Sequence, residues 1–583
     1  MAYDLIIRGG TVVDGTGREP YTADVAITGE SVVAIGTDLG DAQVVYDASG
    51  SYVTPGFVDI HTHYDGQATW DQEMAPSSWH GVTTVVMGNC GVGFAPAAPD
   101  RHDWLIRLME GVEDIPGSAL SEGMSWNWES FPEYLDALEE MPRAVDVATH
   151  VPHGAVRAYV MGDRGAANED PTESDIARMA NIVEEGLRAG ALGFSTSRTV
   201  LHKSVDGELV PGTTATPEEL IGIGRGMARV GHGVFEMASD LVPEWNEFEW
   251  MGDLSRETGL PVTFTALQSP VKAMSFDDQM ANMREQNAKG ANILAQISMR
   301  GTGLILGWRT TFNPFSFKPS WAEVADLEEA AQLERLTDPD FRHKLITEES
   351  VYPDSDVQIL TELMATAFTM QYELSDGFDY EPSAQQSIAY LAEQAGVSGA
   401  EYAYDLLMSE GGRGFIYFPL LNYADGNLNF LEPVLQSDDC INSLSDGGAH
   451  CGTICDAASP TFMLQHWVRD REGFKLSLSR AIKRQCADTA KVYGLDDRGI
   501  LAPGYLADIN IIELEKIGMS KPWVANDLPA GGKRLLQSAT GYRATFKSGV
   551  QTFDNGRYLE ETPGTLIRGP QASPAADSLK AAS

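Results

Sequence analysis

Two histidines two residues apart, His61 and His63, are the side chains of this sequence best suited to metal chemistry. They end the segment PGFVDIHTH at 55–63, in which Val58 and Ile60 give the apolar, β-branched pattern of a buried strand. Because side chains alternate along a strand, both imidazoles point the same way and can hold one metal ion. A His-x-His pair alone is weak evidence, but polar residues follow it directly, as where a barrel strand opens into an active-site loop.

Two other residues could join this chemistry, although each also has an ordinary explanation. Asp446 lies in SLSDGGAH, almost a whole barrel's length further along the chain, and could instead be a turn aspartate before Gly-Gly. Cys90 follows the apolar run TTVVM and could be only a small buried side chain. A cysteine thiolate is nevertheless a good zinc ligand.

These segments together resemble the amidohydrolase superfamily. PGFVDIHTH is similar to its first-strand metal motif, and SLSDGGAH resembles its last-strand motif. Further segments resemble the N-acyl-D-amino-acid deacylase (D-aminoacylase) family, with similarity running essentially from end to end. They are VVMGNCG around Cys90, GVEDIP at 111–116, HGAVR at 153–157, GALGFST at 190–196 and DDRGILAPGYLADINIIE at 496–513.

The resemblance implies a metal-dependent hydrolase of a non-peptide carbon–nitrogen bond in a small amide. A metal-activated water would attack the carbonyl, and Asp446 would act as general base for its proton. His61, His63, Cys90 and Asp446 would be metal ligands. The cofactor would be Zn²⁺, as one or two ions, with another divalent metal as the alternative.

The sequence also departs from the family at two metal positions. Where the family has a histidine in Thr-His-Ile-Arg, this chain has Glu236 in the stretch 235–238; where it has Ile-Ser-His, the stretch 264–268 contains no histidine. We expect Glu236 to face the barrel interior as an oxygen ligand, a proton-transfer group or a paired structural carboxylate. His153 and His450, near predicted strand ends, are either partners of the ligands or ordinary polar residues.

The substrate-binding positions differ as well. Gln268 replaces a family lysine and Val200 a family tyrosine, both of which would hold a substrate carboxylate. Arg198 could take over anion binding, or it could be structural. We therefore predict that simple N-acetyl-D-amino acids are poor substrates and that aromatic residues of a long insertion bind larger ones. Those aromatic residues are Trp308, Phe312 and Phe315.

The elements that must position these residues alternate between strand-like and helix-like runs. This pattern predicts an α/β fold with a (β/α)₈ TIM-like barrel over 56–490, interrupted by an insertion at about 301–440 that would form a lid. Short alternating strands at 1–55 and 491–570 predict a small β-sandwich domain built from both chain ends. The polar stretch 571–583 predicts a tail.

Composition excludes several other classes of protein. The 583 residues include 41 basic and 84 acidic side chains, a net charge of −43 that disfavours nucleic acid and anionic membranes as partners. The five cysteines form no C-x-x-C pair, and no leader or membrane span is evident, so we expect a cytoplasmic protein without disulfides. The protein could form a homo-oligomer.

The alternatives to a deacylase function are a hydrolase of a larger or cyclic amide (lactam or imide) and a non-catalytic scaffold that keeps the fold.

Overall fold

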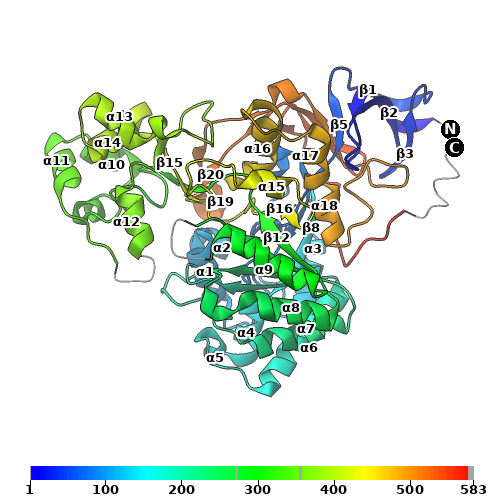
Figure 1. Cartoon of the computed structure of the whole chain (residues 1–583), viewed down its shortest axis with the longest axis horizontal. Coiled ribbons are helices and arrows are strands. Elements are labelled where there is room, and N and C mark those ends of the chain that lie inside the picture. Colours follow the sequence, from blue (N-terminus) through cyan, green and yellow to red (C-terminus); the bar gives the residue numbers. More distant parts are fainter. Residues whose placement is uncertain (1, 270–273, 354–357, 575–583) are drawn as a thin grey trace.

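A computed structural model describes residues 2–269, 274–353 and 358–574 of the protein (Figure 1). The core of the protein is an eight-stranded parallel sheet. Its strand order, β16-β12-β11-β10-β9-β8-β7-β6, follows the chain and confirms the predicted TIM-like α/β architecture. The strands are β6 (Phe57–Asp59), β7 (Val82–Met87), β8 (Asp146–Pro152), β9 (Gly193–Arg198), β10 (Val234–Ser239), β11 (Val262–Ala266), β12 (Ile293–Ile297) and β16 (Cys440–Asn442).

Helices connect successive strands and cover the outside of the sheet. One of them is α6 (Glu173–Ala189), which Thr172 caps through a reciprocal capping box with Asp175. The others around the barrel are α1 (His102–Glu113), α2 (Gly117–Gly123), α3 (Phe131–Glu139), α4 (His153–Met161), α5 (Asp163–Ala166), α7 (Pro217–Ala228), α8 (Glu247–Thr258), α9 (Phe276–Ala288), α15 (Leu431–Leu435), α16 (Ser459–Phe462), α17 (Leu478–Gln485) and α18 (Ala487–Val492).

The residues after the two edge strands meet and join the edges of the sheet. Thr62 and Gly447 form a parallel bridge, and the His63 N–H donates to the Gly447 carbonyl at 2.7 Å. The Asp446 N–H donates to the His61 carbonyl at 3.1 Å. This junction therefore brings together the first and last predicted motifs, which lie almost 400 residues apart in the sequence.

The interior of the barrel is layered from apolar to polar toward the carboxyl ends of its strands. A buried apolar cluster fills the lower layer, with side chains from strands and from the C-terminal segments: Val58, Ile60, Val86, Ala148, Leu192, Val234, Ile441, Tyr493, Leu495 and Ile567. Two residues further along the strands, on the same face, stand His150, Glu236 and Ser443. Strand alternation thus explains why a carboxylate at position 236 faces the interior.

Strands from both chain ends pair in one nine-stranded mixed sheet, shown at the upper right of Figure 1. β17 lies between β5 and β22, so a C-terminal strand separates the N-terminal strands from the last hairpin. The members are β1 (Tyr3–Val12), β2 (Tyr21–Thr28), β3 (Ser31–Gly36), β4 (Ala42–Asp47), β5 (Tyr52–Pro55), β17 (Ile509–Ile512), β22 (Tyr542–Lys547), β23 (Val550–Asp554) and β24 (Arg557–Tyr558). Two short ribbons accompany it, β18 (Gly518–Met519) with β21 (Ala539–Thr540) and β19 (Trp523–Leu528) with β20 (Gly532–Leu536).

A large insertion between β12 and β16 stands apart at the left of Figure 1. It has its own antiparallel sheet, β13 (Thr302–Leu306), β15 (Ile416–Leu421) and β14 (Tyr372–Glu373), and its described residues include five α-helices. These helices are α10 (Glu329–Leu336), α11 (Pro339–Thr347), α12 (Gln358–Thr366), α13 (Ile388–Ala395) and α14 (Gly399–Gly412).

The aromatic residues expected to bind substrate belong instead to the core of this insertion. Trp308 is 4% exposed and Phe315 1% exposed, and the two rings stack with centroids 5.6 Å apart. Phe312 packs against the same cluster. The expectation that Trp308 and Phe315 supply a binding surface is therefore wrong, because an insertion of this size needs its own core and uses large side chains for it. Phe312 is only partly buried, and its role in binding stays a prediction.

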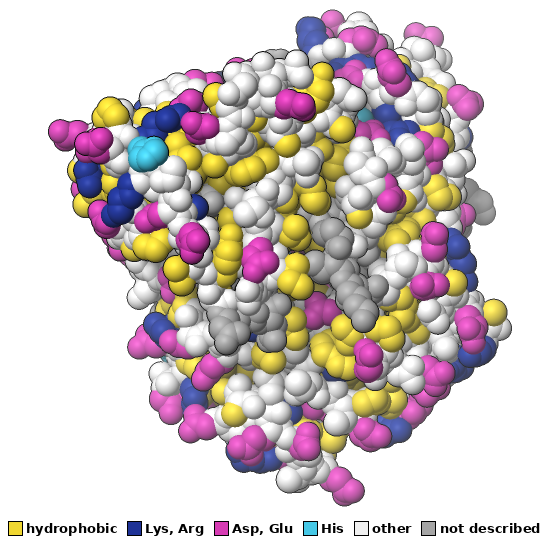
Figure 2. All heavy atoms as spheres, turned by 60° about the vertical axis from the view of Figure 1, so that its left-hand side comes forward, with side chains coloured by type: hydrophobic (Ala, Val, Ile, Leu, Met, Phe, Trp, Pro, Cys, Tyr) yellow, Lys and Arg dark blue, Asp and Glu magenta, His cyan; other side chains and the backbone are white. Residues whose placement is uncertain are grey.

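Acidic side chains are spread over the face shown in Figure 2, with Lys and Arg among them. No helix within the described residues is long and apolar enough to span a bilayer. The predicted tail begins at 571, and its residues 575–583 lie outside the described part of the chain.

Candidate active site

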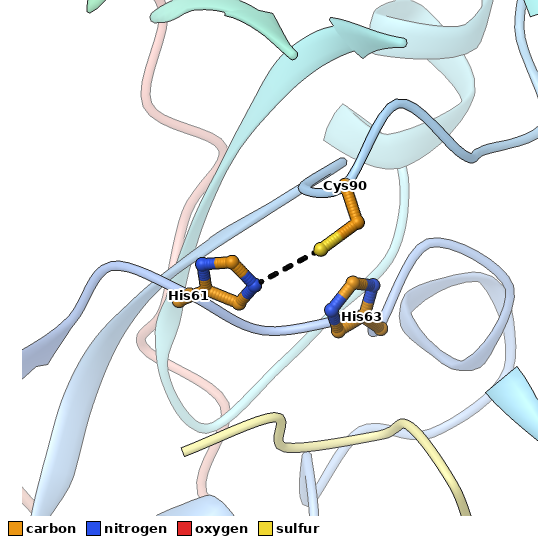
Figure 3. Close-up of side chains that lie close together, drawn as sticks. All are labelled: His61, His63 and Cys90. Carbon is orange, nitrogen blue, oxygen red and sulfur yellow. Dashed lines mark hydrogen bonds between the residues drawn. The ribbon is translucent and has the colours of Figure 1, made fainter. Parts of the chain in front are cut away.

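Three side chains converge at the carboxyl end of the barrel strands (Figure 3). His61 and His63 come from the segment after β6, and Cys90 comes from the loop after β7. Each offers one ligand atom within 4.8 Å of the others, and all three residues are buried. The Cys90 Sγ lies 3.3 Å from His61 Nε2, the contact drawn in Figure 3.

A glutamine fixes the tautomer of His61. His61 Nδ1 lies 2.7 Å from Gln296 Oε1, while Gln296 Nε2 donates to Thr263 Oγ1 at 2.9 Å. In this orientation the amide oxygen faces the imidazole, and Nδ1 carries the hydrogen that this oxygen accepts. Nε2 of His61 is then left with a lone pair toward Cys90.

A carboxylate lies beside His63 Nδ1, as Gln296 lies beside His61 Nδ1. Glu113 Oε1 lies 3.1 Å from His63 Nδ1, although the N–H is not aligned for a hydrogen bond. Burial lowers the pKa of His63, but the charges of Glu113 and Asp446 outweigh burial and raise this pKa to about 9. For His61, burial dominates and lowers the pKa to about 4.

Asp446 completes the group from the last strand motif. Its Oδ1 lies 3.5 Å from His61 Nε2 and 3.7 Å from His63 Nε2. Burial raises the pKa of Asp446, but the neighbouring imidazoles outweigh burial and bring this pKa to about 2. The side chain is therefore a carboxylate at neutral pH.

The Cys90 loop packs tightly against the neighbouring strands. Cys90 itself has φ +54°, a left-handed conformation that is costly for a non-glycine residue and that occurs preferentially at functional sites. Gly88 and Gly91 flank it closely. In the structure a Cβ at Gly91 would lie 2.7 Å from the Ser197 nitrogen, and one at Gly88 would lie 2.7 Å from the His150 carbonyl oxygen. These glycines thus allow the loop to pack on β8 and β9, which aims the thiol inward.

Glu236 lies on β10 behind this loop and is fully buried. Its Oε2 accepts from the Cys90 N–H at 3.0 Å, and its Oε1 lies 3.9 Å from His61 Nδ1 with no hydrogen-bond partner among the described residues. Burial raises the pKa of Glu236 to about 8. The carboxyl group therefore contacts the ligand-bearing loop and lies near the Nδ1 side of His61.

The donor set fits a divalent metal ion. Two imidazoles, a thiol and a carboxylate form the mixed N/S/O set typical of zinc. Around a tetrahedral ion with bonds of about 2.0–2.3 Å, neighbouring donor atoms lie about 3.3–3.7 Å apart. The contacts of His61 Nε2 at 3.3 Å with Cys90 and 3.5 Å with Asp446 match that spacing.

The two residues predicted to bind substrate already have partners in the structure. Arg198 is buried, and its Nε donates to Glu247 Oε1 at 2.7 Å. Gln268 contacts a loop of the insertion, where its Nε2 donates to Asp425 Oδ2 at 2.7 Å and its Oε1 accepts from the Ala424 N–H at 3.0 Å. Their substrate-binding role stays a prediction.

Three further histidines differ in their surroundings. His153 forms a buried pair with Glu219, whose Oε1 lies 3.1 Å from His153 Nε2. His450 lies with its Nε2 3.7 Å from Glu113 Oε2. His202, which the sequence analysis did not select, is held by Ser197 Oγ at 3.0 Å. Burial first, and then the charges of His450 and His63, lower the pKa of His202 to about 3.

Sequence reasoning missed two residues that contact the histidine pair. Glu113 belongs to the segment GVEDIP and lies one helical turn after Met109 on the buried stripe of α1. Gln296 lies two residues after Leu294 on β12, so the two side chains point to the same face of the strand. Helical and strand periodicity could have identified both.

Comparison with known proteins gives a consistent result over most of the chain. The model of a family described as "Amidohydrolase family" matches residues 44–553. A D-aminoacylase from Alcaligenes xylosoxydans xylosoxydans is 38% identical over 231 residues, 39% of this chain and 43% of that protein. An N-acyl-D-aspartate deacylase from the same organism is 28% identical over 581 residues, 98% of this chain and 96% of that protein.

A solved structure has the same fold. The N-acyl-D-glutamate deacylase from Bordetella bronchiseptica, complexed with zinc and a phosphonate inhibitor that mimics the tetrahedral intermediate, superposes with a TM-score of 0.63. The match covers 98% of this chain and 100% of that chain at 21% identity. At this identity the likeness concerns the fold.

Proposed function

Because the chain belongs to the amidohydrolase family, we propose that it is an enzyme that hydrolyses a non-peptide carbon–nitrogen bond, the amide of an N-acyl amino acid or a related small compound. The observation that carries this proposal is the buried group His61, His63 and Cys90 facing the Asp446 carboxylate. The names of the two Alcaligenes relatives, an aminoacylase and an N-acyl-D-aspartate deacylase, support the substrate class.

In this proposal His61, His63 and Cys90 hold one divalent ion, zinc by the chemistry of the donors, with Asp446 beside it. When bound, such an ion polarises a carbonyl and lowers the pKa of water. Asp446 is ionised at neutral pH, so it can accept a proton from the attacking water and return it to the leaving nitrogen. Gln296 keeps the lone pair of His61 Nε2 directed at the site.

The substrate is proposed to be larger or less anionic than a simple N-acetyl-D-amino acid. The lysine that the deacylase motif carries is absent from this chain, and Gln268 at its position donates a hydrogen bond to Asp425 of the insertion. A lost charge-assisted contact is worth about 1.5–3 kcal/mol, and about 1.4 kcal/mol corresponds to a factor of ten. We therefore expect kcat/KM for N-acetyl-D-methionine to be no higher than that for its uncharged amide.

The decisive test is elemental analysis of the purified protein combined with a substrate panel. The panel contains N-acetyl-D- and L-methionine, the uncharged amide of the D compound, a bulky aromatic N-acyl amino acid and a cyclic imide. Stoichiometric zinc with turnover of an acyclic amide supports the proposal. Turnover of the imide alone would favour a cyclic amidase, and a protein without metal and without turnover would be a scaffold.

The histidine pair provides the matching mutational prediction. His61→Ala combined with His63→Ala removes two of the three clustered ligand atoms, so zinc content after dialysis should fall to background and turnover should disappear. The control is His153→Ala, which removes a buried histidine paired with Glu219. Equal zinc in the double variant and the wild type would contradict the proposed site.

A further inference from the structure

Glu113 is a buried carboxylate in a place that disfavours a negative charge. It is 1% exposed, and neither carboxylate oxygen has a hydrogen-bond partner among the described residues. It is also the last residue of α1, where the helix dipole repels an anion. A buried, unbonded carboxylate costs free energy, so this position requires a compensating partner.

The compensating groups are two histidines of the candidate active site. Glu113 Oε1 lies 3.1 Å from His63 Nδ1, and Oε2 lies 3.7 Å from His450 Nε2. One oxygen therefore faces a proposed metal ligand, and the other faces the loop that follows Asp446. Asp114, the next residue, binds the same loop: its Oδ2 accepts a hydrogen bond from the Gly452 N–H at 3.1 Å.

We infer that Glu113 is a positioning residue that sets the orientation and tautomer of His63 and ties the Asp446 loop to the end of α1. This inference rests on the proposed metal site. The negative charge of Glu113, 3.1 Å from His63 Nδ1, favours a hydrogen on Nδ1. This leaves Nε2, which lies 3.7 Å from Asp446 Oδ1, as the atom that would bind the ion. An anionic partner also makes the imidazole a stronger donor.

The two histidines of the pair are thereby supported by different chemistry. His61 Nδ1 faces the neutral amide oxygen of Gln296 at 2.7 Å, whereas His63 Nδ1 faces a carboxylate. Replacing the carboxylate of Glu113 by an amide keeps the shape but removes the charge. The resulting loss should appear in metal affinity, because the side chain acts through His63 and not on substrate.

The test is zinc affinity, measured by competition with a chelator, for the wild type, Glu113→Gln and Glu113→Asp. Loss of such a supporting group typically weakens metal binding by roughly 10–100-fold, which we expect for the Gln variant. The Asp variant keeps the charge and should recover part of the affinity. The absorption spectrum of the Co²⁺-loaded protein should shift in the Gln variant, reporting an altered ligand environment.

Glu219→Gln is the matched control. Glu219 is equally buried and lies 3.1 Å from His153 Nε2 and 2.8 Å from Arg157 Nε, but it contacts neither His61 nor His63. The Glu219→Gln variant should have a lower thermal stability than the wild type and the same zinc affinity. Equal losses of affinity in both Gln variants would reduce Glu113 to a folding role and overturn the inference.

Two other results separate this inference from the proposed function. If the wild type and Glu113→Gln bind zinc equally well, only the inference about Glu113 fails. If the wild type itself binds no divalent ion, the proposed function fails and the inference fails with it. If the Gln variant does not fold, Glu113→Ala takes its place, and an unchanged zinc affinity and Co²⁺ spectrum in that variant would also overturn the inference.

Discussion

At the scale of residues, each side chain at the site is aimed by a second side chain behind it. Gln296 supports His61, and Glu236 receives the backbone N–H of Cys90 at 3.0 Å. The sequence motifs predicted the group formed by His61, His63 and Cys90, because their spacing and their resemblance to known motifs carry that information. Gln296 and Glu113 were not predicted, although strand and helix periodicity place each of them on the side that faces the site.

Glu236 gives a prediction at this scale. We expect Glu236→Gln to keep its zinc, because the group with close ligand atoms contains His61, His63 and Cys90 without Glu236. A proton-transfer role would lower kcat by roughly a hundredfold. The measurements are metal content and kcat, with Glu247→Gln, a buried carboxylate paired with Arg198, as the control. Loss of zinc would instead make Glu236 a ligand, and unchanged kcat would exclude both roles.

At the scale of elements, the barrel strands were predictable and the insertion largely was not. Each barrel strand is a compact, mostly β-branched or apolar run, and consecutive strands pair with each other. The insertion sheet instead pairs β13 with β15 and β14 with β15, so its partners lie up to about a hundred residues apart. Because these short strands pair with partners far away in the sequence, local sequence patterns do not predict their pairing.

Glu381 gives a prediction about how the insertion is attached to the barrel. Its Oε2 contacts His466 Nε2 at 2.7 Å and Arg471 Nε at 2.8 Å, both near the π-helical segment Met463–Asp470. Burial raises the pKa of Glu381, but these partners outweigh burial and lower this pKa to about 2, below the ordinary value of 4.5. The stabilisation is therefore complete above about pH 4.5 and is lost as the pH falls through about 2.

Glu381→Gln should lower the free energy of unfolding at pH 7 by about 1.5–3 kcal/mol, the value of hydrogen bonds to a charged group. The difference from wild type should shrink as the pH approaches 2. Denaturant midpoints at pH 7, 4 and 2.5 provide the measurement. Glu323→Gln, which breaks a half-exposed pair with Lys344, should cost no more than about 1 kcal/mol. A difference for Glu381 that does not change with pH would contradict the ion-pair explanation.

At the scale of the whole molecule, a buried charge network fastens the mixed sheet to the barrel. Lys547 on β22 is 1% exposed and lies 2.9 Å from Asp508 and 3.0 Å from Asp146 at the start of β8. Arg498 also pairs with Asp146. The return of a strand pattern near the C-terminus predicted the pairing of the two ends, but no sequence pattern predicted which charges meet between sheet and barrel.

Lys547→Met tests this junction. It leaves Asp508 buried without its cation, and breaking a buried pair in this way costs about 3–5 kcal/mol. The rate of irreversible thermal inactivation should rise. Lys289→Met, which breaks an exposed pair with Glu285, serves as the control and should have little effect. Similar inactivation rates for the two variants would show that the network does not hold the sheet.

The position of β17 between β5 and β22 has a consequence for biosynthesis. β5 ends at Pro55 and pairs with a strand that begins at Ile509, so residues 56–508 are translated in between. At about 5–20 residues per second, a ribosome needs roughly 30–120 s for the full chain, and for most of that time the N-terminal strands have an open edge. The edge of β5 therefore stays without its partner during most of synthesis, and the sheet is completed only when the strand that begins at Ile509 has been translated.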